Sequence, residues 1–212
     1  MPKLAESYTL RTSAEAPREE IEVNAKRFST ERIRLRALEK KDVGALGSYL
    51  NDPCLIGRRY LPWEIRDVAP LSEMQGERIL EEWGKETKGF TLGVELRESG
   101  DLVGHAGCRW RWDTHCPDVF VVVSPAHQRQ GIGSEAVRLL LGYLFGETPA
   151  HSVNSWVASW NDGGLAFARS IGFTESGRIP RSGLRDGRWV EEVMIDLLRR
   201  EWFEREGGSD GA

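Results

Sequence analysis

Three segments of the chain alternate apolar and polar residues with a period of two, the spacing of strands that have one buried face. They are 32–38, 90–97 and 102–111. Gly100-Asp101 separates the second from the third and predicts an antiparallel hairpin. The uninterrupted apolar run Val119–Val123 predicts a central strand covered on both faces. Further strands are predicted over 153–158, 174–184 and 188–197, the last two joined at Asp186-Gly187.

Apolar residues at helical spacing predict four helices. They are 40–50, a helix that starts at Ser72, 131–146 and 161–171. Asn51-Asp52-Pro53 should stop the first helix, and Ser72 with Gln75 resembles a capping box at the start of the second. Gly172 should end the last helix, because glycine readily takes the left-handed conformation found there. Residues 54–70 read as a long irregular segment.

The order of these elements is β-α-α-β-β-β-α-β-α-β-β, with no linker that would divide the chain. We therefore expect a single α/β (α+β) domain with a mixed, mostly antiparallel sheet of about seven strands flanked by four helices. The expected domain spans 30–203, preceded by a flexible or peripheral arm over 1–29 and followed by a frayed tail over 204–212.

Composition narrows the class of protein. The net charge of -4 argues against general nucleic-acid binding, and the N-terminal segment lacks the apolar stretch of a signal peptide or a membrane span. The three cysteines, Cys54, Cys108 and Cys116, form no CxxC pair, so we expect reduced thiols, no metal site and a cytoplasmic protein.

The segment from Val121 to Glu135 carries the chemistry. An apolar strand ends at Pro125, a basic loop with Arg129 follows, and Gly131 and Gly133 open a helix. The first amides of a helix have no internal partner and the helix dipole is positive there, so an anion such as a pyrophosphate can bind. The alternative is a turn whose glycines serve only packing. The Rossmann fingerprint fits poorly, and the Walker A loop is excluded because no Gly-Lys-Ser/Thr follows.

Gln128-x-x-Gly131-x-Gly133 after this strand resembles the signature of the GCN5-related N-acetyltransferases (GNAT). Asn161 followed by Ile171-Gly-Phe173 is similar to the family's N…GF segment, and 185–190 with Glu201-Trp202 resembles its RimJ/RimL-like branch. The resemblance implies a splayed pair of parallel strands and transfer of an acetyl group from acetyl-CoA, the cosubstrate, to a primary amine. The residues that it implies for acetyl-CoA are Val121, Val122, Val123, Gln128, Arg129, Gln130, Gly131, Ile132, Gly133, Ser134 and Asn161. Asn161 also suits a helix N-cap, and both roles can hold.

The reaction so implied is direct attack of a neutral amine on the thioester. A base must deprotonate the amine, and a backbone N–H near Val122 or Val123 would stabilise the oxyanion. Asp118 and Glu175 are the candidate catalytic bases, each of which could instead be a solvated strand residue. The chain departs from the family at two positions: Ala168 and Gly164 stand where a Tyr or a Ser often serves as general acid.

Other residues have a structural and a functional reading. His105 is favoured as a satisfied core or cleft histidine over a base, His127 is expected to face water, and Phe173 is expected in the core. Aromatic and basic residues near the expected acceptor side suit an aromatic or cationic acceptor, although core packing explains some of them equally well. They are Arg58, Arg59, Tyr60, Trp63, Trp110, Trp112 and Trp160.

The acceptor itself stays open between a protein N-terminal amine and a small-molecule amine. Two alternatives also stay open: an acyl-CoA-binding module of the same fold with little turnover, and transfer of another acyl group or use of another CoA or nucleotide donor. A homodimer is possible at the level of the family.

Overall fold

The computed structural model describes residues 27–55, 70–111 and 113–207 of the chain. The expectations for the N-terminal arm up to residue 26, and for Arg58, Arg59, Tyr60, Trp63 and Trp112, lie outside these ranges. No helix within them is long and apolar enough to span a membrane.

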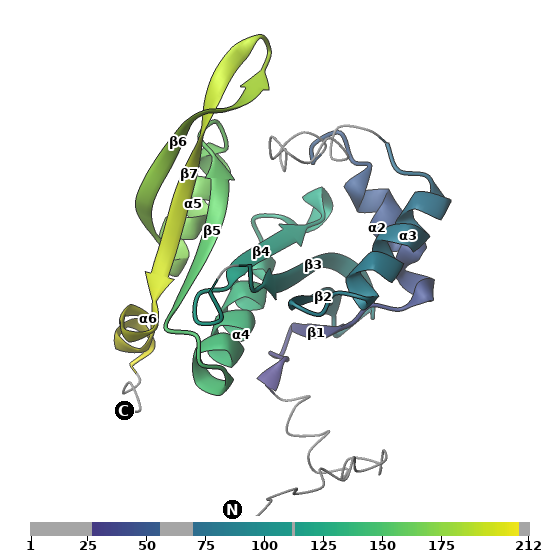
Figure 1. Cartoon of the computed structure of the whole chain (residues 1–212). Coiled ribbons are helices and arrows are strands. Elements are labelled where there is room, and N and C mark those ends of the chain that lie inside the picture. The colour runs from purple at the N-terminus through teal and green to yellow at the C-terminus, as the bar shows by residue number, and fades with distance from the viewer. Residues whose placement is uncertain (1–26, 56–69, 112, 208–212) are drawn as a thin grey trace, which may run out of the picture.

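Seven strands form one sheet in the order β1-β2-β3-β4-β5-β7-β6. Every neighbouring pair is antiparallel except β4 and β5, which are parallel. The mostly antiparallel, mixed sheet expected from the sequence is therefore confirmed (Figure 1). The strands are β1 (Ile33–Ala37), β2 (Gly89–Leu96), β3 (Leu102–Arg109), β4 (Asp118–Val123), β5 (Ser152–Ala158), β6 (Thr174–Arg185) and β7 (Arg188–Leu198).

The four predicted helices are present. They are α2 (Val43–Leu50), α3 (Glu73–Gly84), α4 (Ile132–Glu147) and α5 (Asp162–Ile171). Two short 3₁₀ segments, η1 (Lys40–Asp42) and η3 (Pro125–His127), precede α2 and α4. The capping box is confirmed, since Gln75 N–H donates to Ser72 Oγ at 3.3 Å and Gln75 Oε1 accepts from Ser72 N–H.

A fifth described helix, α6 (Arg199–Glu206), was not predicted, and it takes up the first positions of the expected tail. Its sequence, RREWFERE, is strongly polar and has no apolar stripe, so periodicity does not reveal it. Trp202 is its one buried residue, and it packs beside Phe145 of α4. Tertiary contacts of Trp202, and of the partly buried Phe203 beside it, thus hold a strongly polar helix against the core.

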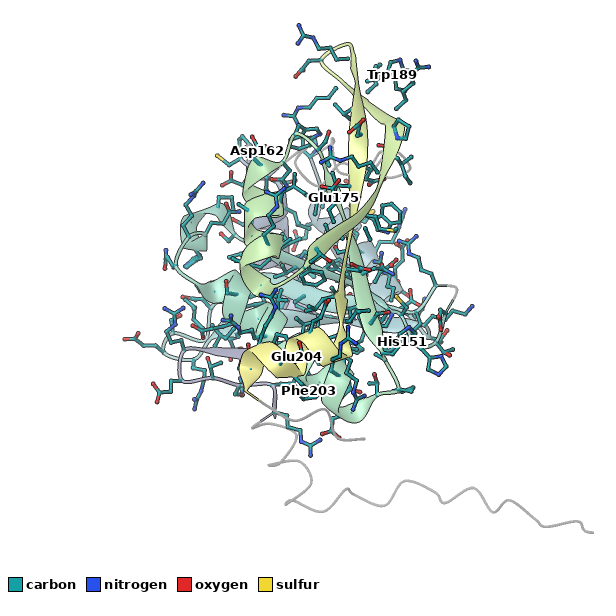
Figure 2. All side chains as sticks on the ribbon, turned by 90° about the vertical axis from the view of Figure 1, so that its left-hand side faces the viewer. His151, Asp162, Glu175, Trp189, Phe203 and Glu204 are labelled. Carbon is teal, nitrogen blue, oxygen red and sulfur yellow. The ribbon has the colours of Figure 1, made fainter. Side chains whose placement is uncertain are left out.

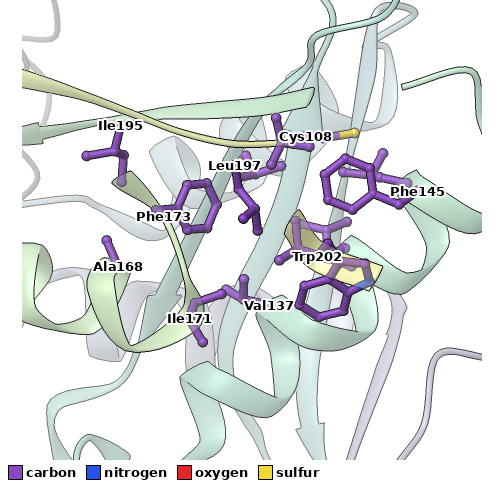
Figure 3. Packing of buried hydrophobic residues seen from close by; sticks show 14 of the residues in the cluster. Cys108, Val137, Phe145, Ala168, Ile171, Phe173, Ile195, Leu197 and Trp202 are labelled. Atoms are coloured by element: carbon purple, nitrogen blue, oxygen red, sulfur yellow. The ribbon is translucent and has the colours of Figure 1, made fainter. Parts of the chain in front are cut away.

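The larger core lies between one face of the sheet and α4, α5 and α6 (Figure 3). Phe173 lies in this core, as predicted. The β-strand residues in it are Cys108, Val119, Val153, Val193, Ile195 and Leu197. Because side chains alternate along a strand, Phe120, Val122, Trp156, Ala158 and Glu192 lie on the opposite face, which we call the front face. Helices α2 and α3 pack on the front face over β2 and β3 (Figure 1).

The parallel pair β4–β5 is joined at one end only. Asp118 is in register with Asn154, and Asn154 N–H donates to Pro117 O at 3.1 Å, but β4 has no further register partner in β5. In Figure 1 the β5–β7–β6 part of the sheet stands apart from the β1–β4 part. The splayed parallel pair expected from the sequence is therefore present, with its closed end at Asp118.

Candidate active site

The loop between β4 and α4 is shaped by its own amide side chains. Gln128 Nε2 donates to Val123 O at 2.9 Å, and Gln130 Nε2 donates to Ala126 O at 3.1 Å. Arg129 is held at φ 59°, a left-handed conformation that is uncommon for a residue other than glycine. The two glutamine side chains thus hold the loop in shape through hydrogen bonds to its own carbonyl groups.

Gly131 is the N-cap of α4 and has φ 83°, which favours glycine. No side chain caps the helix, so the first amides of α4 have no internal acceptor. A Cβ on Gly131 would lie only 3.3 Å from Arg32 Nη2, while a Cβ on Gly133 would make ordinary contacts with Phe167 and Val123. The loop thus provides free N–H groups, a positive helix end and room at the backbone, which together fit a pyrophosphate.

Arg32 is a cation at this loop that the sequence pattern did not single out. Its Nη2 donates to Gln130 O at 2.8 Å and its Nε donates to Glu135 Oε1 at 2.7 Å. Thr30 Oγ1 donates to the other Glu135 oxygen at 2.7 Å. Arg32 therefore neutralises the carboxylate in the first turn of α4, which would otherwise repel an anion. Nothing in the sequence links residues this far apart.

The backbone of β4 alternates between its two neighbours. Ser124 N–H donates to Val103 O at 2.8 Å, and Val122 O approaches Gly104 so closely that a Cβ there would lie at 2.3 Å, so even-numbered residues face β3. Pro117 O accepts from Asn154, so odd-numbered residues face β5. The N–H groups turned toward the opening therefore belong to Val121 and Val123, not to Val122, whose side chain lies on the front face.

Asn161 caps α5: its Oδ1 accepts from Gly164 N–H at 3.0 Å. A Cβ at Gly164 would lie 2.6 Å from Asn161 Nδ2, so a side chain at this position would displace the cap. Ala168 is buried in the core, where a tyrosine has no room. The two departures from the family pattern thus belong to the packing of α5, and neither position offers a general acid.

Asp118 lies at the closed end of the opening. Its Oδ2 is 2.5 Å from Arg111 Nε in an ion pair. Burial raises the pKa of the Asp118 carboxyl above its ordinary value, although Arg111 and Arg109 act in the opposite direction. Asp118 is thus a half-buried carboxylate that is ion-paired with Arg111 and has a second cation, Arg109, nearby.

Glu175 lies at the start of β6, the edge strand, and β5 and β7 separate it from β4 (Figure 2). It accepts two hydrogen bonds from Arg178, at 2.6 and 2.9 Å, and this partner lowers the pKa of the Glu175 carboxyl. An exposed, paired carboxylate at the sheet edge is the solvated strand residue that the sequence left open. The structure does not bring it together with Asp118.

The remaining predicted positions have clear places. His105 is buried and its Nδ1 lies 2.8 Å from Tyr49 Oη, beside Trp83, which agrees with a satisfied core histidine. His127, expected to face water, has its Nδ1 buried without a hydrogen-bond partner in the described part of the chain. The guanidinium of Arg185 lies over the ring of Trp160 in a cation–π contact, 3.7 Å from the ring centroid.

Glu192 on β7 is a buried carboxylate that the sequence analysis missed. Its residue is 1% exposed, and neither Oε1 nor Oε2 has a hydrogen-bond partner in the described ranges. Burial raises the pKa of the Glu192 carboxyl above its ordinary value. The available signal was an acidic pair, Glu191-Glu192, inside a strand where strict alternation would place only one polar side chain.

The cysteines form no disulfide: Cys54, Cys108 and Cys116 are all free. Within the described ranges, no group of three or more His, Cys, Asp or Glu side chains could hold a metal ion.

Comparison with known proteins identifies the family. A family model described as an acetyltransferase (GNAT) domain matches residues 32–174. An uncharacterised N-acetyltransferase, YnaD of Bacillus subtilis, is 24% identical over 175 residues, which cover 82% of this chain and 98% of that protein. An L-methionine sulfoximine/L-methionine sulfone acetyltransferase of Salmonella typhimurium is 32% identical over 107 residues, covering 47% of this chain and 60% of that protein.

Among solved structures, the spermidine N-acetyltransferase of Vibrio cholerae in complex with CoA and spermine superimposes with a TM-score of 0.69. The match covers 82% of this chain and 99% of that one at 19% identity, so it shows a shared fold. The family model covers more than half of the sequence, and its match includes β4, the loop that follows it and α4. The chain therefore belongs to the GNAT family and is an N-acetyltransferase.

Proposed function

We propose that the enzyme transfers an acetyl group from acetyl-CoA to a primary amine by direct attack. One observation carries the proposal. The uncapped first turn of α4, opened by Gly131 and Gly133, lies next to β4 backbone groups that have no partner in β5. The first fits a pyrophosphate and the second fits an extended amide chain, and acetyl-CoA joins these two features in one molecule.

The proposed contacts follow from this geometry. The amides of Ile132, Gly133 and Ser134 would bind pyrophosphate oxygens, with Arg129 adding positive charge. Val121 and Val123 would pair with the pantetheine arm through their backbone. Gln128 and Gln130 would keep the loop in shape, as their hydrogen bonds to Val123 O and Ala126 O indicate.

The chemistry needs little from side chains at the leaving group. A backbone N–H of Val121 or Val123 can stabilise the oxyanion, since both face the opening. The leaving thiol has a pKa near 8.5, so solvent can supply its proton. This agrees with the Ala168 and Gly164 positions, which offer no acid. Asp118 stays within the proposed site at the closed end of the opening, and Glu175 is left out because it lies on the edge strand.

The acceptor is proposed to be a small amine or a peptide N-terminus. The named relatives include an enzyme for amino-acid derivatives and, at the level of fold, one for spermidine. Both substrates carry a primary amine, which supports the coarser class. The RimJ/RimL-like branch, a peptide acceptor, a homodimer and a cytoplasmic location stay predictions.

Gly131→Val tests the donor site. The left-handed backbone at Gly131 costs a branched residue roughly 1–2 kcal/mol, and the side chain would stand where the phosphate approaches. We expect the acetyl-CoA dissociation constant, measured by calorimetry, to rise roughly tenfold or more. Gly142→Val is the matched control, because Gly142 lies in the same helix and a Cβ added there would meet nothing within 4 Å. Unchanged affinity in Gly131→Val would contradict the donor assignment.

The second candidate, a binding module with little turnover, is favoured by the missing acid at Ala168 and Gly164. Thiol release from acetyl-CoA, followed with a panel of primary amines, separates the two. Binding of acetyl-CoA without thiol release for any amine identifies the module. Amine-dependent release identifies the transferase.

A further inference from the structure

Glu192 is a buried acidic side chain with no hydrogen-bond partner among the described residues. It is 1% exposed, and both carboxylate oxygens lack a hydrogen-bond partner in the described part of the chain. An ionised carboxylate buried in this way is costly, so buried charges in proteins are normally paired. A cationic ligand would be such a partner.

The register of the sheet places Glu192 level with the proposed reaction centre, on the far side of β5. It is in register with Ala158 of β5. Asp118 is in register with Asn154, and β4 and β5 are parallel, so four residues further along both strands Val122 is level with Ala158. Glu192 is therefore level with the segment of β4 that offers its N–H groups to the oxyanion. The residue at this level on β5, between β4 and β7, is Ala158, whose side chain is a single methyl group.

Among the described residues, no charged side chain hydrogen-bonds to the Glu192 carboxylate. On the front face its neighbours on β5, β6 and β7 are uncharged; they are Trp156, Ala158, Ile179, Val190 and Met194. Further along that face, the described titratable residues are farther away and neither oxygen of Glu192 hydrogen-bonds to them; they include Asp196 and Arg188 on β7, Asp118 on β4, and His105 and Arg109 on β3. Arg178 is in register with Val193, on the other face, where it pairs with Glu175 and Glu191. Helix α6 begins at Arg199, beyond the far end of β7.

We propose that Glu192 binds the ammonium group of the acceptor amine and takes its proton. The inference rests on the proposed acetyl transfer, whose base it names. The ammonium gives one proton to the Glu192 carboxylate, and the neutral amine attacks the thioester carbonyl carbon. A C–N bond forms and the C–S bond breaks. The second proton of the amine goes to the leaving thiolate, and Glu192 returns its proton to water.

The proposal also defines the acceptor class. Glu192 recognises an amine that arrives protonated, which means an alkyl primary amine. An aromatic amine such as aniline is neutral at pH 7 and has no proton to lose before attack. The direction of the Glu192 pKa supports this role, because a base is most effective when its pKa lies closer to the working pH than that of an ordinary carboxylate.

The kinetic test compares benzylamine with aniline as acceptors from pH 6 to pH 9. We expect Glu192→Gln to lower kcat/KM for benzylamine by about 100-fold at pH 7, with the loss shrinking toward pH 9 as free amine accumulates. The rate with aniline should change little. Glu191→Gln is the matched control: Glu191 is the adjacent residue, and its side chain pairs with Arg178 on the other face. Equal pH profiles for Glu192→Gln and the wild type would overturn the proposal.

A second measurement needs no turnover. Benzylamine alone, at pH 7.5, should raise the melting temperature of the wild type and of Glu191→Gln but not that of Glu192→Gln. Retained acetyl-CoA affinity in Glu192→Gln shows that the variant is folded. If no amine is acetylated but the Glu192-dependent shift is present, the proposed function fails and the ammonium site stands. If amines are acetylated and the shift is the same in all three proteins, the ammonium site fails and the proposed function stands.

Discussion

Two regions of the protein bury carboxylates in opposite ways. Near β1, Arg36 donates to both oxygens of Asp42 at 2.8 Å and also to Glu95, while Arg34 pairs with Glu95 at 2.6 Å. On β7, Glu192 is buried at least as deeply, and neither of its oxygens has a hydrogen-bond partner in the described residues. The first region is a closed network, and the second is a single charge.

The pKa values follow this difference. The guanidinium of Arg36 lowers the pKa of Asp42, and for Glu95 the pairing with Arg36 and Arg34 outweighs burial, so its pKa is also lowered. Burial alone raises the pKa of Glu192. A carboxylate that stabilises the fold is therefore supplied with partners from within the fold, and this contrast is the reason to look for the partner of Glu192 among ligands.

The largest loss of folding stability should come from removing Arg36, the cation shared by Asp42 and Glu95. Arg36→Ala leaves Asp42 and Glu95 buried without their shared cation, and losing one partner of a buried pair typically costs about 3–5 kcal/mol. The free energy of unfolding in urea measures this. Arg34→Ala is the control, because the Arg34 side chain is half exposed and Glu95 keeps Arg36. A smaller loss for Arg36→Ala than for Arg34→Ala would show that the network does not stabilise the fold.

Glu192→Gln should raise the free energy of unfolding near neutral pH, whereas Arg36→Ala should lower it. A carboxyl with a raised pKa in the folded state contributes stability below its unfolded pKa, and this contribution is lost as the pH rises through the folded pKa. The wild type should thus lose stability relative to Glu192→Gln as the pH rises above the ordinary pKa of a glutamate, by about 1.4 kcal/mol for each unit that separates the folded and unfolded pKa values. Denaturation midpoints measured over this rise in pH check it. Parallel pH curves for the two proteins would mean that Glu192 is paired after all.

The smallest effect should come from Glu175→Gln. Glu175 and its partner Arg178 are both exposed, and exposed ion pairs contribute little because solvent screens them. Neither the urea midpoint nor kcat/KM should change measurably. A large loss of kcat/KM at unchanged stability would instead support a catalytic role for Glu175.

Much of the fold could be predicted because its signals are local. The alternation in 32–38 and 90–97, the capping box at Ser72 and the left-handed glycines each depend on a few neighbouring residues. Helix α6 escaped prediction because Trp202 and Phe203 hold it through contacts with parts of the core that are distant in sequence, such as Phe145 of α4. Its polar sequence by itself does not distinguish a docked helix from a frayed end.

The candidate site divides in the same way. The order of strand, glycine loop and helix predicted the left-handed glycine and the uncapped helix start at 131–134, because glycine adopts this conformation freely and the first amides of any helix lack an internal partner. Only the tertiary structure decided that Arg32 joins this loop, that Val121 and Val123 rather than Val122 face the opening, and that Glu192 is level with them. These facts depend on which strands pair and in which register, and pairing is a long-range choice. The residues next to a strand in the sequence do not determine which other strand it pairs with, or in which register.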